Sequence, residues 1–388
     1  MTSGKAKIVD ATKLPAYGMG SGHPFGDDRL VPFYALLRAL DWLPDAEVLP
    51  TRPATDAELL LGHEQDYIAL QKALDDDELR DEASHSAPLF GMGTSDNPIV
   101  PGQHVAAAAA VGATLACVHA VLEGRAEHAF NPGGGLHHAM PRSASGFCIY
   151  NDLVIGIRAA RQGGVARVLY VDFDVHHGDG VEHAFATDPS VLTISFHETP
   201  EVRWPGTGWV HEIGRDPAKG YALNVPLASG TGDAAWLDAV QDVLVPAARN
   251  FRPELIVSQH GCDTHREDPL ADLALTTRPM LEAAKITHRL AHELCSGRWV
   301  ATGGGGYRPK HVIPRAWALV WAEMSGREIP QTLPEKWRSV IAAPPGDPLP
   351  TTFIDAPAPD PREAQAARID LATRTRLREI LAKVGRSL

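Results

Sequence analysis

The stretch Arg167–Gly180, which reads RVLYVDFDVHHGDG, joins an apolar run to a cluster of aspartates and histidines. The apolar run predicts a buried strand over residues 167–174. Residues two apart on a strand face the same way, so Asp172, Asp174 and His176 are predicted to converge at the strand's end. Carboxylate and imidazole groups suit a divalent transition metal such as zinc, and buried carboxylates are costly without a cation. This stretch therefore predicts a metal site, with a polar hydrogen-bonded turn as the alternative.

The rest of the chain alternates short apolar runs with longer helical patterns. Further strands are predicted over 191–197, 254–259 and 299–302, and helices over 149–162, 234–250 and 277–295. Such alternation predicts an α/β fold with a mostly parallel sheet and helices on both faces. Ligands of these sheets bind beyond the carboxyl ends of the strands, which is where the polar residues collect.

The composition changes near residue 340. We predict a single catalytic α/β domain over residues 1–335 and a separate C-terminal part over 336–388. The stretch 342–361 is too rich in proline for a helix or a central strand, and 363–384 returns to a helical pattern. The C-terminal part is therefore predicted to be an extended arm and a closing helix docked on the body, with a partner-binding tail as the alternative.

Composition favours a cytoplasmic enzyme. The chain has 388 residues and a net charge of −12, which argues against nucleic-acid or anionic-membrane partners. The alanine-rich stretch 105–118 is expected to be too short and too weakly apolar to cross a bilayer. The start, MTSGKAKIVD, has no apolar region typical of a signal peptide. The four cysteines lie far apart, which predicts neither disulfides nor a cysteine-ligated zinc site. A homo-oligomer stays open.

A zinc site needs a third protein ligand and an open position for water. Asp263, just past a predicted strand, is the candidate. Asp268 is its rival, but it precedes a proline and is expected to shape a turn. His260 and His265 rank lower, because a lone histidine in a loop is more often solvated.

Two glycine-rich segments carry further candidate groups. In NPGGGLHH, residues 131–138, the adjacent His137 and His138 point in different directions, so each needs its own partner. A histidine held by a carboxylate is a suitable general acid or base near neutral pH, and Asp172 and Asp179 are the available carboxylates. An anion-binding loop is the alternative.

The second segment, TGGGGY at 302–307, ends in a tyrosine. Its phenol could stabilise an oxyanion beside a metal-bound carbonyl. Alternatively, the segment is a flexible turn with a packing tyrosine.

Taken together, the motifs resemble the zinc-dependent histone deacetylases over about residues 23–308. Five motifs occur in that family's order: GGGLHHA, SGFCIYND, VDFDVHHGDG, WPGTG and GGGGY. The resemblance implies the arginase/deacetylase fold, a single three-layer α/β/α domain. The segments SFHET (195–199) and DTH (263–265) are similar to the bacterial acetoin-utilisation deacetylases in particular.

The resemblance also implies roles for individual residues. Zinc, or else iron(II) or cobalt, would be bound by Asp174, His176 and Asp263. The catalytic residues would be His137, His138, Asp172, Asp179 and Tyr307. A structural potassium ion would be bound by Asp172, Asp174, His176, Ser195 and Phe196. A second potassium ion would lie near main-chain oxygens of Phe185, Asp188, Val191 and Tyr221.

Substrate contacts follow from the same resemblance. Phe147 and Trp204 would flank a narrow acyl-lysine tunnel with Gly146 on its floor, and Asp96 would hold the substrate backbone at the rim. Trp204 stands where many relatives carry phenylalanine.

The implied activity is zinc-dependent hydrolysis of acetyl-lysine, in a protein or peptide, to acetate and a free amine. Zinc would polarise the carbonyl and activate a water, His138 would accept a proton, and Tyr307 would stabilise the oxyanion. The general acid could be His138 or His137. An acetylated metabolic enzyme is expected as substrate rather than chromatin.

Three alternatives remain. An acetylpolyamine or other small N-acyl amine amidohydrolase would share the core, but Leu270 stands where some polyamine-selective relatives carry an acid, although Glu267 is near. An arginase-like enzyme would need a second set of metal ligands. A non-catalytic acyl-lysine-binding protein should have lost a ligand or the tyrosine.

Overall fold

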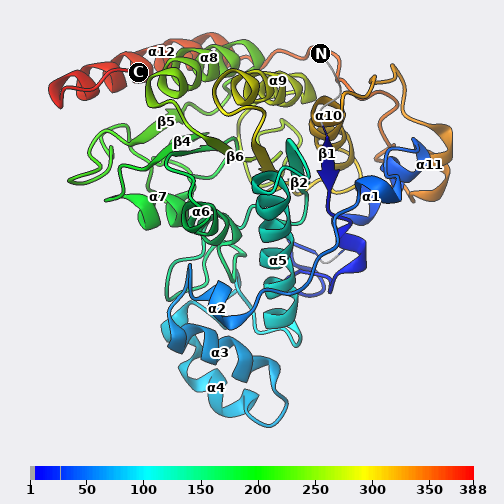
Figure 1. The fold of residues 1–388 in the computed structure, drawn as a ribbon. Helices are drawn as coiled ribbons and strands as arrows, with labels where there is room; N and C mark the ends of the chain where they lie inside the picture. The colour runs from blue at the N-terminus through cyan, green and yellow to red at the C-terminus, as the bar shows by residue number, and fades with distance from the viewer. Residues whose placement is uncertain (1–4, 27) are drawn as a thin grey trace.

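Seven parallel strands form the central sheet of the computed structural model, which describes residues 5–26 and 28–388 (Figure 1). The strand order is β1-β2-β7-β6-β3-β4-β5. In chain order the strands are β1 (Ala6–Ile8), β2 (His128–Asn131), β3 (Val168–Asp172), β4 (Val191–Glu198), β5 (Ala222–Leu227), β6 (Leu255–Gln259) and β7 (Trp299–Thr302). The predicted α/β class and parallel sheet are confirmed.

Twelve α-helices surround this sheet within the described residues. They are α1 (Val31–Ala39), α2 (Asp56–Leu59), α3 (Gln65–Asp75), α4 (Arg80–Ser86), α5 (Gln103–Leu122), α6 (Asp152–Gln162), α7 (Asp179–Phe185), α8 (Asp233–Phe251), α9 (Thr277–Leu294), α10 (Ile313–Ser325), α11 (Glu335–Val340) and α12 (Glu363–Lys383). Figure 1 shows α2, α3 and α4 together at the bottom of the view, beyond the sheet.

The two faces of the sheet pack against different helices. On β3, Leu169 and Val171 belong to a core shared with α1, α8, α9 and α10, whereas Val168 and Tyr170 belong to a core shared with α5, α6 and α7. This two-residue alternation is the expected consequence of side chains pointing to opposite faces of a strand. The result is the three-layer arrangement that the resemblance implied.

The predicted elements agree with the observed ones except at some of their ends. Strand β3 ends at Asp172, two residues earlier than expected, and α6 begins at Asp152 rather than at Ile149. Strands β1, β2 and β5 were not predicted. β1 and β2 are too short to show a periodicity, and β5 contains Pro226, which is tolerated because β5 lies at the sheet edge.

Helix α5 extends beyond the stretch 105–118 at both ends, and the whole helix is strongly apolar. Among the described residues, it is the one helix long and apolar enough to span a membrane, so the expectation that 105–118 is too short was wrong. Its apolar window is 78% buried inside the protein. Packing against α6 and β2 therefore explains the composition of α5 as that of a core helix.

The C-terminal part packs on the body. Trp337 and Phe353 are buried, and the Trp337 indole donates a hydrogen bond to the carbonyl of Pro32. Helix α12 lies along β5 and α8, with Leu377 and Leu381 in the core. The arm thus covers apolar surface that would otherwise face water.

We predict that Leu377→Ala lowers the free energy of unfolding by about 2–5 kcal/mol, because it leaves a cavity in a fully buried site. Urea unfolding followed by circular dichroism measures the change. Leu371→Ala, on the exposed side of the same helix, is the matched control and should cost no more than about 0.5 kcal/mol. Equal effects of the two substitutions would contradict the docking of α12.

Candidate active site

The candidate residues follow the carboxyl ends of four neighbouring strands. β2, β7, β6 and β3 are adjacent and parallel, so their carboxyl ends lie side by side. The loops that follow them carry the two histidines, the tyrosine, Asp263, and the pair Asp174 and His176. The site therefore lies where parallel sheets usually bind ligands.

Asp174, His176 and Asp263 form a buried cluster whose ligand atoms all lie within 4.8 Å of one another. His176 Nδ1 is 3.2 Å from Asp174 Oδ1 and 3.2 Å from Asp263 Oδ2. Asp174 and His176 lie beyond the end of β3, so a turn, rather than strand alternation, brings them together. One imidazole and two carboxylates form a donor set that suits zinc.

Neighbouring groups orient both carboxylates. The side-chain amide of Gln259 and the backbone N–H of Gly305 donate to Asp174 Oδ2 at 2.7 and 2.8 Å, and Val175 N–H donates to Asp263 Oδ1 at 3.0 Å. A Cβ atom at Gly305 would lie 2.0 Å from Asp263 Oδ2, so glycine is required there.

Burial and the Asp174 carboxylate together raise the pKa of Asp263 to about 6. Two like charges held this close in a buried site repel one another unless a cation lies between them. The residues present therefore fit a divalent metal ion.

His137 is paired with Asp172. Its Nδ1 donates to Asp172 Oδ2 at 2.7 Å, and both side chains are buried. The phenol of Tyr170 donates to the same carboxylate oxygen. Burial lowers the pKa of His137, but the carboxylates of Asp172 and Asp174 outweigh it and raise that pKa to about 9. The two carboxylates therefore favour the protonated form of His137.

His138 is paired with Asp179, the first residue of α7, through an Nδ1–Oδ1 hydrogen bond of 2.7 Å. Burial and the neighbouring His137 lower the pKa of His138 to about 4. The pKa values of the two adjacent histidines are thus shifted in opposite directions, and His138 can accept a proton. Both carboxylate partners are those suggested from the sequence.

The N-terminus of α6 holds the loop that carries these histidines, which sequence reasoning missed. Asp152 accepts hydrogen bonds from the backbone N–H groups of Gly135 and Leu136, at 3.1 and 2.8 Å. The Asn151 amide donates to the carbonyl of His137. The glycine loop does bind an anion, but the anion is a carboxylate of the same chain. Asp152 lies in the motif SGFCIYND, which was the available signal.

Tyr307 lies beside the carboxylate cluster. Burial and the charges of Asp263 and Asp174 raise the pKa of its phenol well above the usual value, so the phenol stays protonated. Its backbone N–H donates to Asp268 Oδ2 at 2.8 Å, and Asp268 Oδ1 accepts from Leu270 N–H at 3.0 Å. Asp268 shapes a turn, as expected, and also fixes the backbone of Tyr307.

Aromatic rings border this cluster. The ring of Phe147 lies 5.9 Å from that of Tyr307, and the ring of Trp204 lies 4.6 Å from that of His138. Phe147 has a φ of +67°, and its carbonyl accepts a hydrogen bond from the Tyr17 phenol. A Cβ atom at Gly146 would lie 2.5 Å from both His138 and Trp204, so only glycine fits between them.

The remaining predicted substrate contacts lie farther out. Asp96 is exposed, and its charge acts on His23, whose ring packs on Phe147 at 4.6 Å. Leu270 is half-buried on the turn of Asp268, and its carbonyl accepts from Arg203. Asp96 thus lies on the same side as the aromatic border.

The expected potassium ligands are close to the cluster of Asp174, His176 and Asp263. Ser195 pairs in register with Asp172, and its hydroxyl bonds His197 Nδ1 at 2.8 Å. The Phe196 side chain stacks on Phe173. Of the second set, Phe185, Asp188 and Tyr221 already accept backbone hydrogen bonds through their carbonyls.

His260 and His265 are buried, so the expectation that they are solvated was wrong. His260 Nε2 bonds the hydroxyl of Ser258 at 2.9 Å. His265 Nε2 donates to Asp355 Oδ2 at 3.0 Å, and Asp355 Oδ1 accepts from the buried Arg315 at 2.6 Å. Asp355 belongs to the C-terminal arm, and nothing in the sequence signalled that it supports the Asp263 loop.

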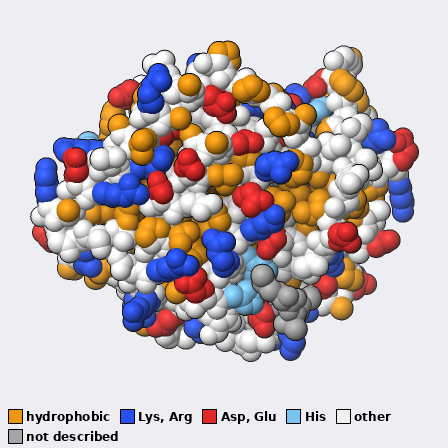
Figure 2. Space-filling model, turned by 90° about the horizontal axis from the view of Figure 1, so that it is seen from above, with side chains coloured by type: hydrophobic (Ala, Val, Ile, Leu, Met, Phe, Trp, Pro, Cys, Tyr) orange, Lys and Arg blue, Asp and Glu red, His pale blue; other side chains and the backbone are white. Residues whose placement is uncertain are grey.

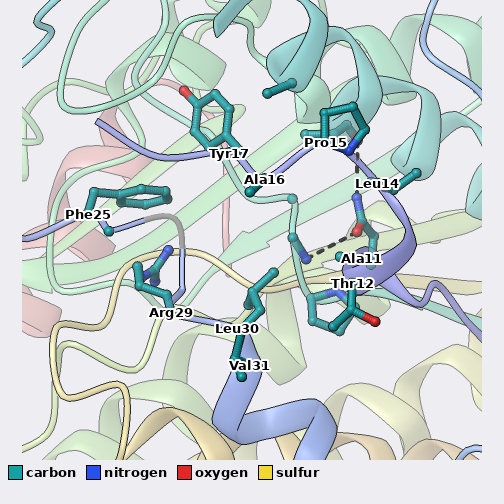
Figure 3. A pocket seen from close by; sticks show the side chains of 17 residues that line it. Ala11, Thr12, Leu14, Pro15, Ala16, Tyr17, Phe25, Arg29, Leu30 and Val31 are labelled. Carbon is teal, nitrogen blue, oxygen red and sulfur yellow. Dashed lines mark hydrogen bonds between the residues drawn. The ribbon is translucent and has the colours of Figure 1, made fainter. Parts of the chain in front are cut away.

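A cavity of about 180 Å³ is lined in part by residues 131–134 of the first glycine-rich segment (Figure 3). Figure 3 shows Arg29 and Phe25 together at one end, and the guanidinium lies 4.0 Å from the ring centroid. Arg29 also donates to the carbonyls of Gly304 and Gly306, at 2.8 and 3.1 Å. This buried cation therefore fixes the backbone that leads into Tyr307.

Comparisons with known proteins agree with this geometry. Residues 23–324 match the family model described as histone deacetylase domain. The chain is 42% identical over 330 residues to acetoin utilization protein AcuC of Bacillus subtilis, covering 85% of this chain and 84% of that protein. It is 36% identical over 330 residues to AcuC of Staphylococcus xylosus, covering 85% of each chain.

Solved structures are similar as well. The crystal structures of an HDAC homolog complexed with SAHA and of an HDAC homolog from Aquifex aeolicus each superpose with a TM-score of 0.81 at 31% identity. Each match covers 94% of this chain and 99% of the other.

We predict that Asp355→Ala destabilises the fold by about 3–5 kcal/mol at neutral pH, because it leaves the buried Arg315 without its counter-ion. Burial raises the pKa of Asp355, but His265 and Arg315 outweigh it and hold that pKa far below the usual value. The stabilisation is therefore present above about pH 4, the pKa of unfolded aspartate, and is lost as the pH falls further.

Urea unfolding of wild type and variant at several pH values measures this difference. Asp360→Ala, in the same arm but with the more exposed partner Arg362, is the control and should cost no more than about 1 kcal/mol. If the difference in unfolding free energy between wild type and Asp355→Ala does not become smaller in acid, Asp355 is not the counter-ion that stabilises Arg315.

Proposed function

Because this chain belongs to the histone deacetylase family, we propose that it is a zinc-dependent deacetylase that hydrolyses the amide of acetyl-lysine in a protein or peptide. One observation carries the proposal. Three features lie together at the carboxyl ends of the strands: a buried set of metal donors, two histidines each held by a carboxylate, and a protonated tyrosine. A protein that only binds acyl-lysine would not need all three.

Asp174, His176 and Asp263 would hold the metal ion. When bound, the ion would polarise the amide carbonyl and lower the pKa of a water molecule. Zinc suits one imidazole and two carboxylates, and iron(II) or cobalt would fit the same ligands.

The chain's own residues would move the protons. Neutral His138, oriented by Asp179, can accept a proton from the attacking water. The phenol of Tyr307 would donate a hydrogen bond to the oxyanion that develops on the carbonyl. Once protonated, His138 could return a proton to the leaving amine, and the charged His137 is the alternative donor. The products would be acetate and a free amine.

The border of the site favours an aliphatic acyl-lysine chain. Phe147 and Trp204 would flank the chain, Gly146 would form the floor, and Asp96 would hold the substrate backbone. We further propose that the substrate is an acetylated metabolic enzyme, in line with the acetoin utilization proteins that this chain resembles. Potassium binding and a cytoplasmic location stay predictions.

A small acetylated polyamine is less well supported. Leu270 offers no charge to a secondary ammonium group. Glu267 lies 3.8 Å from the Arg308 guanidinium, which pairs more closely with Asp347 at 2.7 Å. The Leu270 position itself therefore supplies no attraction for a polycation.

We predict that Tyr307→Phe lowers kcat on an acetyl-lysine peptide by about 10²–10³-fold, because it removes one donor to the oxyanion. Acetate release by zinc-loaded protein is the measurement. Tyr221→Phe, a partly buried residue just before β5, keeps the main-chain carbonyl expected to bind potassium and should leave the rate unchanged. Unaltered turnover in Tyr307→Phe, with the metal still bound, would remove the tyrosine from the mechanism.

Leu270→Glu should shift selectivity toward acetylspermidine over the peptide by about fivefold in kcat/KM, because an exposed ion pair contributes about 1 kcal/mol. Leu270→Gln has nearly the same shape without the charge and should not shift it. If wild type already prefers acetylspermidine, the acetyl-lysine assignment is wrong.

A further inference from the structure

A second cluster of possible metal ligands lies at the amino end of β2, whereas the candidate active site lies at the carboxyl ends of the strands. It consists of His128, His288 and His292, whose ligand nitrogens all lie within 4.8 Å of one another. His128 is the first residue of β2, whereas the glycine loop follows the last residue of that strand. The two histidine-containing sites are therefore separated by the length of the strand.

His288 and His292 lie four residues apart on α9, so their side chains share one face of the helix. Their Nε2 atoms are 3.0 Å apart. The ring of His128 lies 4.6 Å from the His288 ring and 5.1 Å from the His292 ring, nearly perpendicular to both. Three imidazoles from a strand and a helix thus converge on one point.

The central observation is that His128 is fully buried, yet neither ring nitrogen makes a hydrogen bond to a described group. The backbone groups of Gly297 and Glu127 interact weakly with the ring and raise its pKa, but neither forms a hydrogen bond of normal geometry with a ring nitrogen. An unsatisfied buried polar group costs about 1–3 kcal/mol. Something other than the described protein groups should satisfy this imidazole.

Glu323 of α10 supports the second histidine. Its Oε1 lies 2.7 Å from His288 Nδ1. A carboxylate on one imidazole nitrogen orients the other nitrogen toward a metal, as is usual for histidine ligands. In His288 that other nitrogen is Nε2, the atom that faces His292.

Protonation alone does not account for this arrangement. A proton on each nitrogen of His288 would satisfy the contacts with Glu323 and His292, but it would leave His128 without a partner. A cation bound by one nitrogen from each ring satisfies all three histidines at once.

We propose that His128, His288 and His292 bind a divalent transition-metal ion, with zinc as the first choice, independently of the candidate active site. Three imidazoles with an open fourth position form a known zinc ligand set. His292 is exposed, which gives the ion a path to the site. Figure 2 shows a group of histidine side chains at the surface on the face where Figure 1 places α8, α9 and α12.

The expected role of this ion is structural. It would tie β2 to α9, and the rings of His128 and His288 both pack near Trp299 of β7. A ligand that binds the folded state alone stabilises it, so zinc should raise the melting temperature by an amount that depends on its free concentration.

Equilibrium dialysis against buffered micromolar zinc, followed by metal analysis, tests the proposal. Wild type should bind a second zinc ion per chain that His292→Ala loses, while His292→Ala keeps its deacetylase activity. Asp263→Asn should lose the active-site ion and keep the other. The double variant should bind neither. His85→Ala, an exposed helical histidine on α4, is the matched control and should bind as wild type does.

A second readout does not depend on activity. In the Asp263→Asn background, zinc should raise the melting temperature, and cobalt should give the visible absorption bands of a low-symmetry site. Both effects should vanish with His292→Ala. The proposal is overturned if wild type and His292→Ala bind the same amount of zinc. It is also overturned if the melting temperature with zinc and the cobalt absorption are the same in Asp263→Asn and in the double variant. Failure of the proposed deacetylase activity would leave this stoichiometry unchanged.

Discussion

The burial of two carboxylates against one another is the constraint on which the candidate active site depends. Asp174 and Asp263 come from loops after neighbouring strands and share the imidazole of His176 between them. An amide side chain and several backbone N–H groups point at their outer oxygens, and glycine at 305 lets the backbone approach closely. Such an arrangement is costly in an empty protein and is stabilised by a cation.

The same electrostatic logic separates the tandem histidines. Each imidazole is bound to a carboxylate at the same distance, yet His137 also faces Asp174, whereas His138 faces His137 and an aromatic wall. The pKa values of two adjacent residues of one type are therefore shifted in opposite directions. Their backbone is held by Asp152 and Asn151 at the start of α6, which links helix packing to the position of the reacting groups.

Features that depend on residues close together in the chain could be predicted from the sequence, whereas those that depend on distant residues could not. The motif around Asp174 and His176 predicted the strand and the parallel sheet, because a local apolar run indicates them. It placed the two side chains together through strand alternation, whereas a turn beyond β3 does so. The short strand β2 left no periodic signal, and Pro226 hid β5. The burial of His265 depends on Asp355, ninety positions away in a proline-rich arm, and one sequence has no pattern that predicts such a pair.

The contacts of the arm have a consequence for how this protein is delimited. The match to the family model ends at residue 324, but Trp337, Phe353 and Leu377 lie in the same apolar core as the sheet. The family model is thus shorter than the unit that folds, whereas the matches to the HDAC homolog structures cover 94% of this chain. A fragment cut at residue 324 would expose the core and remove the anion that pairs with Arg315, even though it would keep the catalytic loops.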